Sequence, residues 1–272
     1  MRRSWCFLAL ASSLLLSGCE DTAKEAWVKV VKPCIASDLS DNWLYFGPSG
    51  AIRPGSVWER SADGNWDLRL TQEDVPQLSR YNLEGKPTSC SGTHTSKVDV
   101  SGSLSFENAV TPFSAELSAE LRRAKTISIK ASAIVVESLR QTPFEEFAKN
   151  EPTLSLVYKA LAPAGRYVLV EALKVTGYTA ELDFDQEVAP AIKAKYSGPL
   201  SKAVTGNLGA TITATWTSQT KLQLQSSEGF YIAGRMRAFD LLGKGFSAGG
   251  EESAFNPELA AVSKDAKVIA QY

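Results

Sequence analysis

The chain has 272 residues, of which 29 are basic and 30 are acidic, and its formal net charge is -1 at pH 7. This balance predicts no nucleic-acid partner, because useful phosphate binding needs clustered lysines and arginines and the only local basic cluster is Arg122, Arg123 and Lys125. The hydrophobic content of 44% is enough to build a core in one large domain or two small ones.

The first twenty residues have the pattern of a bacterial secretion signal. Arg2 and Arg3 precede a mostly apolar run, Cys6 to Leu16, that is too short to span a bilayer. The run ends in Leu16-Ser17-Gly18-Cys19, which resembles the lipobox of bacterial lipoprotein precursors. That resemblance implies cleavage before Cys19 and acylation of Cys19, with palmitate among the expected acyl groups, so that the mature chain is anchored in the lipid bilayer. An ordinary cleaved signal peptide and a buried core helix are the alternatives.

The resemblance also bears on location. Glu20 rather than Asp follows Cys19, and by similarity to enterobacterial sorting rules this indicates the outer membrane, with the body facing the periplasm. We therefore expect a bacterial cell-envelope protein with a signal peptide at 1–18, a tether at 19–40 and a globular domain at 41–272. A division of that domain near residue 95, into the aromatic-rich β subregion and a larger α+β body, is the alternative.

Two of the four cysteines remain for the folded body. Cys6 leaves with the signal and Cys19 takes the lipid, so Cys34 and Cys90 face an oxidising compartment and are predicted to form a disulfide. Two free buried thiols are the alternative. No metal and no cofactor are predicted, because the single histidine, His94, has no nearby ligand set with zinc-like spacing.

The segment from 41 to 70 is rich in tryptophan, glycine and proline. Tight turns at Gly47-Pro48-Ser49-Gly50, Arg53-Pro54-Gly55 and Asp63-Gly64 would separate short strands, and aromatic residues suit a half-buried pleated face. We expect a small aromatic-rich β subregion. Its four rings, if exposed together, could form a binding surface for sugar rings or peptide: Trp43, Tyr45, Trp58 and Trp66.

The remainder alternates amphipathic strands with short helices. Arg166 to Phe184 and Asn207 to Ser226 are too long for single strands, so each is expected to be a bent strand or a hairpin, with Gly177 as the break in the first. Helices are expected at 113–125, at 144–161 with a division at Pro152, at 187–195 and at 257–264. The fold class is therefore α+β: mainly antiparallel sheet with two or three short helices, preceded by the aromatic-rich subregion.

Catalytic groups are sparse in this sequence. A nucleophile with a histidine base would depend wholly on His94, and Gly47-Pro48-Ser49-Gly50 lacks the spacing of a nucleophile elbow. Asp183 and Asp185 share strand parity and could serve as paired carboxylates, although a solvated strand end is the favoured explanation. We identify no catalytic residue and treat a His94-dependent hydrolase as an alternative.

Two non-catalytic functions remain. The first is a lipid-anchored envelope protein that binds a glycan, a peptide or a partner protein through the aromatic region. The second rests on the long strands at 166–184 and 207–238 with helical residues between them, which resemble the twisted sheets of gasdermin-type and perforin-type pore formers. That resemblance implies a pore-forming or membrane-acting protein.

Overall fold

The computed structural model describes residues 27, 29–31, 33–34, 43–61, 66–97, 123–200, 211–226 and 228–247. Cys19, the predicted signal peptide at 1–18 and the predicted helix at 257–264 lie outside these residues. Most of the helix predicted at 113–125 also lies outside them, and its last two residues, Ala124 and Lys125, begin a strand instead.

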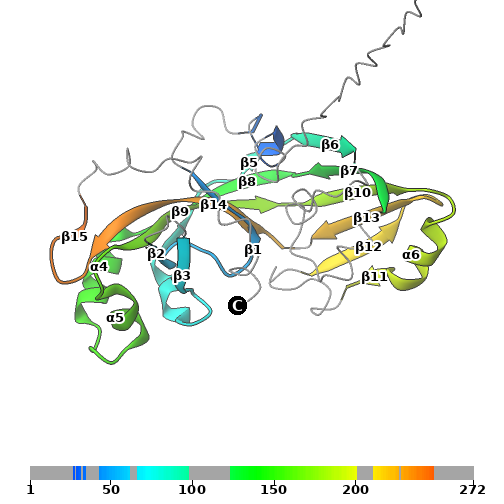
Figure 1. Ribbon diagram of the computed structural model, residues 1–272. Coiled ribbons are helices and arrows are strands. Elements are labelled where there is room, and N and C mark those ends of the chain that lie inside the picture. The colour runs from blue at the N-terminus through cyan, green and yellow to red at the C-terminus, as the bar shows by residue number, and fades with distance from the viewer. Residues whose placement is uncertain are drawn as a thin grey trace, which may run out of the picture.

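The described residues form two antiparallel sheets (Figure 1). In the nine-stranded sheet the path β1-β14-β9-β2-β3 is joined by β15 on β14, by β8 on β9, and by β4 and β5 on β8. Its strands are β1 (Leu44–Ser49), β2 (Val57–Arg60), β3 (Trp66–Leu70), β4 (Asn82–Glu84), β5 (Thr88–Ser89), β8 (Ala133–Leu139), β9 (Arg166–Thr176), β14 (Phe230–Asp240) and β15 (Gly245–Phe246).

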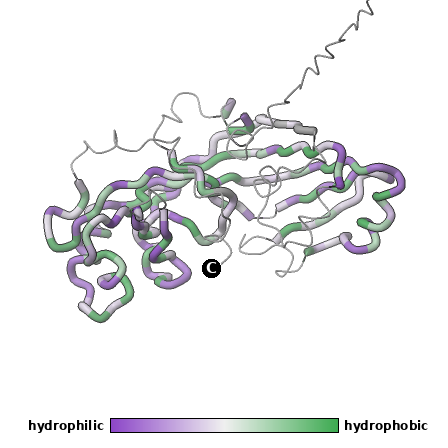
Figure 2. The backbone as a smooth tube through the Cα atoms, in the orientation of Figure 1, coloured by the Kyte–Doolittle hydropathy of each residue, from purple (hydrophilic) through white to green (hydrophobic). Residues whose placement is uncertain are grey.

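The second sheet has six strands in the order β11-β12-β13-β10-β7-β6. Apolar and polar residues alternate along β10, so that Ala180, Leu182 and Phe184 are buried while the residues between them are partly exposed. Hydrophobic and hydrophilic segments alternate along the long strands in Figure 2. The strands are β6 (Thr93–Lys97), β7 (Ala124–Lys130), β10 (Thr179–Phe184), β11 (Gly198–Pro199), β12 (Ile212–Trp216) and β13 (Lys221–Ser226).

Three long strands cross from one sheet into the other at the same level. β7 continues into β8, β9 into β10 and β13 into β14, and the pairing is kept on both sides of the crossing: Lys130 lies opposite Thr179, and Ala133 opposite Thr176. The expected bent strand at 166–184 is thus confirmed, with its break at Gly177, whereas β12 and β13 form a hairpin. We call the row of bends at Ser132, Gly177 and Gly229 the bend line.

The bend line is tightly packed. Ser132 donates hydrogen bonds from its amide to Thr176 O (3.1 Å) and from its hydroxyl to Gly177 O (3.1 Å). Gly177 has φ +60°, and a Cβ placed there would lie 2.6 Å from the Cβ of Ser132. A side chain at position 177 would therefore meet both backbone strain and a steric clash.

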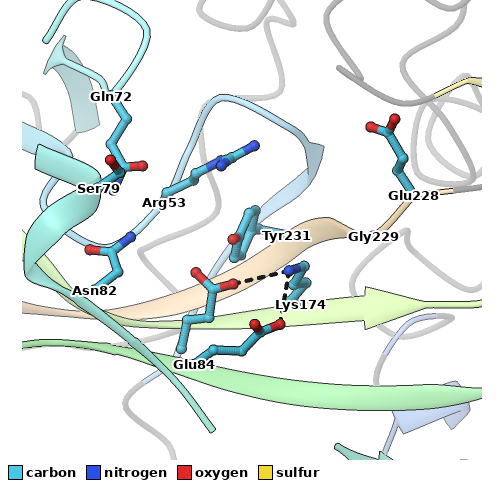
Figure 3. Close-up of a pocket in the computed structure, with 10 residues that line it drawn as sticks. Arg53, Gln72, Ser79, Asn82, Glu84, Lys174, Glu228, Gly229 and Tyr231 are labelled. Carbon is cyan, nitrogen blue, oxygen red and sulfur yellow. Dashed lines mark hydrogen bonds and ion pairs between the residues drawn. The ribbon is translucent and has the colours of Figure 1, made fainter. Parts of the chain in front are cut away.

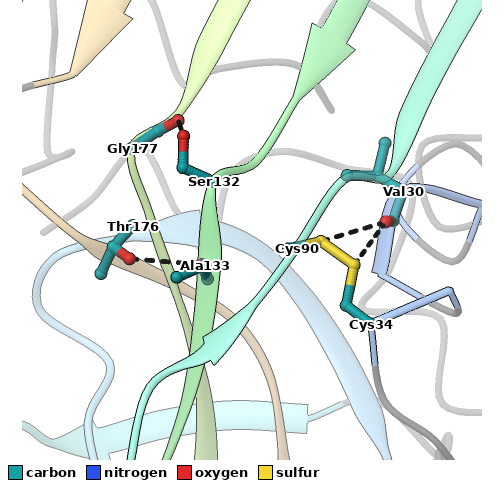
Figure 4. The surroundings of a disulfide bond; sticks show 7 residues. All are labelled: Val30, Cys34, Cys90, Ser132, Ala133, Thr176 and Gly177. Atoms are coloured by element: carbon teal, nitrogen blue, oxygen red, sulfur yellow. Dashed lines mark hydrogen bonds between the residues drawn. A yellow bond between two sulfur atoms is a disulfide. The ribbon is translucent and has the colours of Figure 1, made fainter.

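The Cys34–Cys90 disulfide ties the N-terminal residues to this line (Figure 4). The Cys90 amide donates to Ser132 O (2.8 Å), and the ring centroid of Trp27 lies 5.8 Å from those of Tyr178 and Phe230, which flank the bends. We call the described residues between 27 and 34 the clasp. The clasp falls inside the segment predicted as a tether, yet its Trp27 and Val30 are fully buried in the core.

The helices cover the ends of the sheets. α4 (Gln141–Asn150) and α5 (Leu156–Leu161) are separated at Pro152, as predicted, and the Ser155 hydroxyl caps α5 by accepting from Tyr158 N (3.1 Å). α6 (Ala189–Lys195) has Pro190 in its first turn, where a missing N–H costs nothing, so this proline starts the helix rather than interrupting it. None of the described helices combines the length and the apolar run needed to cross a bilayer.

The aromatic-rich strands belong to the main sheet. β1 pairs with β14, and β2 pairs with both β3 and β9, so segments from the two halves of the chain interleave. Gly47-Pro48-Ser49, predicted as part of a turn, lies within β1, an edge strand whose register shifts between Tyr45 and Ser49. An edge strand tolerates a proline because it leaves one row of amides unpaired.

Candidate functional site

The four aromatic residues predicted to form a binding surface lie in two different places. Trp58 and Trp66 are 1% and 3% exposed and pack with Leu44, Phe46 and Tyr231 in one apolar cluster. Trp43 and Tyr45 are partly buried and pack against another cluster, on the far side of β1. The expected common platform is therefore not present, because alternate residues of short strands point to opposite faces and the larger rings fill the core.

Trp43 and Tyr45 are not free surface rings either. The Arg235 guanidinium lies 5.9 Å from the Trp43 ring centroid, and burial raises the pKa of Tyr45 well above its ordinary range. The Tyr45 hydroxyl has no hydrogen-bond partner among the described residues. Both rings thus serve the packing of β1 rather than a ligand surface.

A polar cavity of about 500 Å³ lies on the nine-stranded sheet beside this region (Figure 3). This volume falls within the range of small-ligand sites. The sheet supplies Asn82, Glu84, Glu137, Lys174 and Tyr231. Loops, a 3-10 helix, η1 (Pro76–Tyr81), and the turn before β14 supply Arg53, Gln72, Ser79, Glu228 and Gly229.

Strand register brings the charged residues of the sheet together. Glu84 on β4 lies directly opposite Glu137 on β8, and Lys174 on β9 lies directly opposite Tyr231 on β14. Glu137 is diagonal to Lys174, because Lys174 pairs with Val135. Direct and diagonal neighbours on one face are within reach of long side chains, so these four side chains meet although the chain separates them by up to 147 positions.

Lys174 forms ion pairs with both carboxylates and offsets one of their two negative charges. Its Nζ lies 3.1 Å from Oε1 of Glu84 and 3.1 Å from Oε1 of Glu137. Burial acts to lower the pKa of Lys174, but hydrogen bonds and charge from Glu137 and Glu84 outweigh that effect and the pKa is raised. Without this lysine, two like charges would face each other across β4 and β8.

Two positively charged side chains lie near the ring of Tyr231. The Arg53 Cζ lies 5.6 Å from its ring centroid and the Lys174 Nζ lies 6.0 Å from it. Burial, and after it the hydrogen bond and charge of Glu137, raise the pKa of Tyr231 far above its ordinary range. The phenol therefore stays protonated and acts as a hydrogen-bond donor.

The loop that carries Arg53 is held in one conformation. The Arg53 Nε donates to Gly50 O (2.9 Å), its amide donates to the Ser56 hydroxyl (3.2 Å), and Gly55 takes φ +91°. Gln72 donates from Nε2 to Pro54 O (2.8 Å). The guanidinium is thus positioned by its Nε, while no described residue partners its two terminal nitrogens.

This arrangement suits the recognition of a polar ligand. It offers a positioned guanidinium, amide groups and a carboxylate at Glu228 in one cavity lining. The sequence did contain a signal for it: Glu137 directly follows the apolar run Ile134 to Val136, and Lys174 lies between Leu173 and Val175. A charge on a buried strand is costly unless it is paired, and such positions commonly mark a site.

The remaining predicted site residues lie elsewhere. His94 is in β6 opposite Ile129, but its side chain is outside the described atoms, so the hydrolase alternative stays a prediction. Asp185 forms an ion pair with Lys125 (2.6 Å) at an exposed strand end. Within the described part of the chain, no group of three or more His, Cys, Asp or Glu residues is placed to hold a metal ion.

Comparison with known proteins gives little further guidance. No protein-family model matches the sequence, and no curated protein matches it. Among solved structures, the chain is similar to a bacterial gasdermin from Bradyrhizobium tropiciagri, with 14% sequence identity and a TM-score of 0.42 over 77% of this chain and 87% of that chain. A match of this quality assigns neither a fold family nor a function to the protein.

Proposed function

We propose that this protein is a lipid-anchored protein of the bacterial envelope that binds a polar ligand in the cavity beside Tyr231. The observation that carries the binding proposal is the cavity itself, with its positioned Arg53 and its ion-paired Lys174. The proposed ligand is a peptide or a glycan, held without a chemical step. The proposed anchor is the acylated Cys19.

Two observations support the envelope location. The Cys34–Cys90 disulfide is typical of proteins that fold in an oxidising compartment. The clasp begins at Trp27, eight residues after Cys19, and eight extended residues reach at most about 28 Å. Acylation of Cys19 would therefore hold the folded body close to the bilayer.

The anchor is tested by metabolic labelling with palmitate. We expect the wild-type protein to carry the label and to fractionate with the membrane, and Cys19→Ala to lose both properties. A Cys6→Ala variant is the matched control, because Cys6 is expected to leave with the signal. Label that persists on Cys19→Ala would contradict the anchor.

The binding function is tested by NMR titration of the full-length protein in detergent micelles. The probes are short peptides and neutral disaccharides. We expect at least one probe to shift resonances of Tyr231, Gly229 and their strand neighbours while those of the six-stranded sheet stay in place. Shifts elsewhere only, or none with any probe, would contradict binding in the cavity.

A second function, membrane perforation, is favoured by one specific observation. Three neighbouring strands cross both sheets and are interrupted only at the bend line, so straightening the bends would convert them into strands of membrane-spanning length. The clasp covers these bends and would have to leave first. Dye release from liposomes at high protein density, measured with the disulfide intact and reduced, tests this proposal: release on reduction supports it, and retained dye in both states excludes it.

A further inference from the structure

The charged residues of the cavity fall into two sets. Lys174 forms ion pairs with Glu84 and Glu137, and the three side chains together carry one net negative charge. Arg53 and Glu228 line the same cavity, and neither forms an ion pair with any residue in the described part of the chain. An opposite-charge pair that is held apart leaves one positive and one negative recognition point for a ligand.

The surroundings of Arg53 and of Glu228 favour pairing with a charged group of a ligand. The Arg53 guanidinium is fixed through its Nε and keeps two terminal nitrogens for a carboxylate, which they match in geometry. Glu228 stands at the turn before β14, where its amide donates to the Ser226 hydroxyl (3.3 Å), and its carboxylate lies to one side of Arg53 and Tyr231 in Figure 3.

A third group in the cavity lining is also available, as an acceptor for a hydrogen bond from a ligand. The Asn82 Oδ1 is buried and has no hydrogen-bond partner among the described residues. A buried acceptor left without a donor is costly, and a ligand N–H would satisfy it. A peptide offers such a group between its two charged ends, whereas a simple anion does not.

Resting on the proposed function of this cavity, we propose that its ligand is a small zwitterion of the amino-acid or short-peptide class. The carboxylate of the ligand pairs with Arg53 and its ammonium pairs with Glu228. The inference is separate from the anchor and from any action on the membrane.

The test is calorimetric titration of the full-length protein in micelles with four probes: dialanine, N-acetyl-dialanine, dialanine amide and a neutral disaccharide. We expect dialanine to bind and each blocked form to bind about tenfold or more weakly, since hydrogen bonds to charged groups are the stronger ones. Arg53→Gln should abolish the loss of affinity that amidation of the ligand causes. Glu228→Gln should abolish the loss of affinity that acetylation causes. Both residues are exposed, so both variants should fold.

Matched controls are Arg80→Gln and Glu73→Gln, which change exposed charges of the same kinds outside the cavity lining. These controls should keep both losses of affinity. Blocked forms that bind within about twofold of dialanine would overturn the inference. Binding of the disaccharide alone, with NMR shifts at the cavity residues, would overturn the zwitterion and leave the proposed binding function standing, and binding of no probe would overturn both.

Discussion

The bend line and the cavity are built on the same strands, β8, β9 and β14, but from opposite materials. At the bend line the clasp packs Trp27 against Tyr178 and Phe230, and Gly177 leaves no room for a side chain. At the cavity the same strands supply Glu137, Lys174 and Tyr231 to a polar lining. Gly229 belongs to both regions and marks where one passes into the other.

This difference separates the region that stabilises the fold from the region that we propose binds a ligand. Apolar burial at the bend line stabilises the joint between the two sheets directly. A lysine flanked by two glutamates at a sheet face adds little stability, because desolvation offsets most of the attraction, so its presence there favours a role in recognition. Substitutions in the two regions should accordingly have different effects.

The largest expected effect is at the clasp. Trp27→Ala should lower the free energy of unfolding by about 3–5 kcal/mol, the usual cost of truncating a fully buried tryptophan. Trp43→Ala, at a partly buried ring, is the control and should cost clearly less. Urea denaturation followed by circular dichroism measures both. Equal losses of unfolding free energy in the two variants would show that the clasp contributes no more to stability than a partly buried ring does.

Next is the disulfide, which closes a sequence separation of 56 residues. Cys34→Ala together with Cys90→Ala should lower the free energy of unfolding by about 2–4 kcal/mol, because the reduced chain gains freedom when unfolded. Reductant should destabilise the wild type by a similar amount and leave the double variant unchanged. A wild type that is insensitive to reductant would contradict this account of the clasp.

A glycine pair isolates the packing of the bend line. Gly177 and Gly165 both have positive φ, at +60° and +76°, but a Cβ meets Ser132 only at position 177 and meets nothing within 4 Å at position 165. Gly165→Ala should cost about 1 kcal/mol of backbone strain, and Gly177→Ala should cost about 1–2 kcal/mol more. Equal losses in thermal or chemical denaturation would mean that the bend accommodates a side chain at position 177 without a steric cost.

The smallest effect is expected at the cavity floor. Lys174→Met combined with Glu137→Gln should lower the free energy of unfolding by about 1 kcal/mol or less at neutral pH, because removing both partners leaves no buried charge unpaired and desolvation offsets most of the attraction. The pKa of Lys174 is raised in the folded state, so its stabilising contribution is complete below the ordinary value of 10.5 and is lost as the pH rises through the folded value. The difference between wild type and variant should therefore shrink above that pH in denaturation curves. A difference that grows with pH would contradict the pairing.

The local features were predictable from the sequence, and the long-range ones were not. The division at Pro152, the break at Gly177 and the Cys34–Cys90 bridge each follow from chemistry near one or two residues. The burial of Trp58 and Trp66 depends on β9 and β14, which lie more than 100 positions further along the chain. The cavity likewise joins residues from 53 to 231, and only the charges inside apolar strands pointed toward it.

The separation of stability from binding is tested most directly by calorimetric unfolding of Arg53→Gln with and without dialanine. A ligand that binds only the folded state raises the unfolding temperature in proportion to its affinity. We predict that the variant without ligand unfolds at the wild-type temperature, and that dialanine raises this temperature for the wild type but not for the variant. A variant that unfolds early without ligand, or that is stabilised by dialanine as the wild type is, would contradict the assignment of Arg53 to ligand binding.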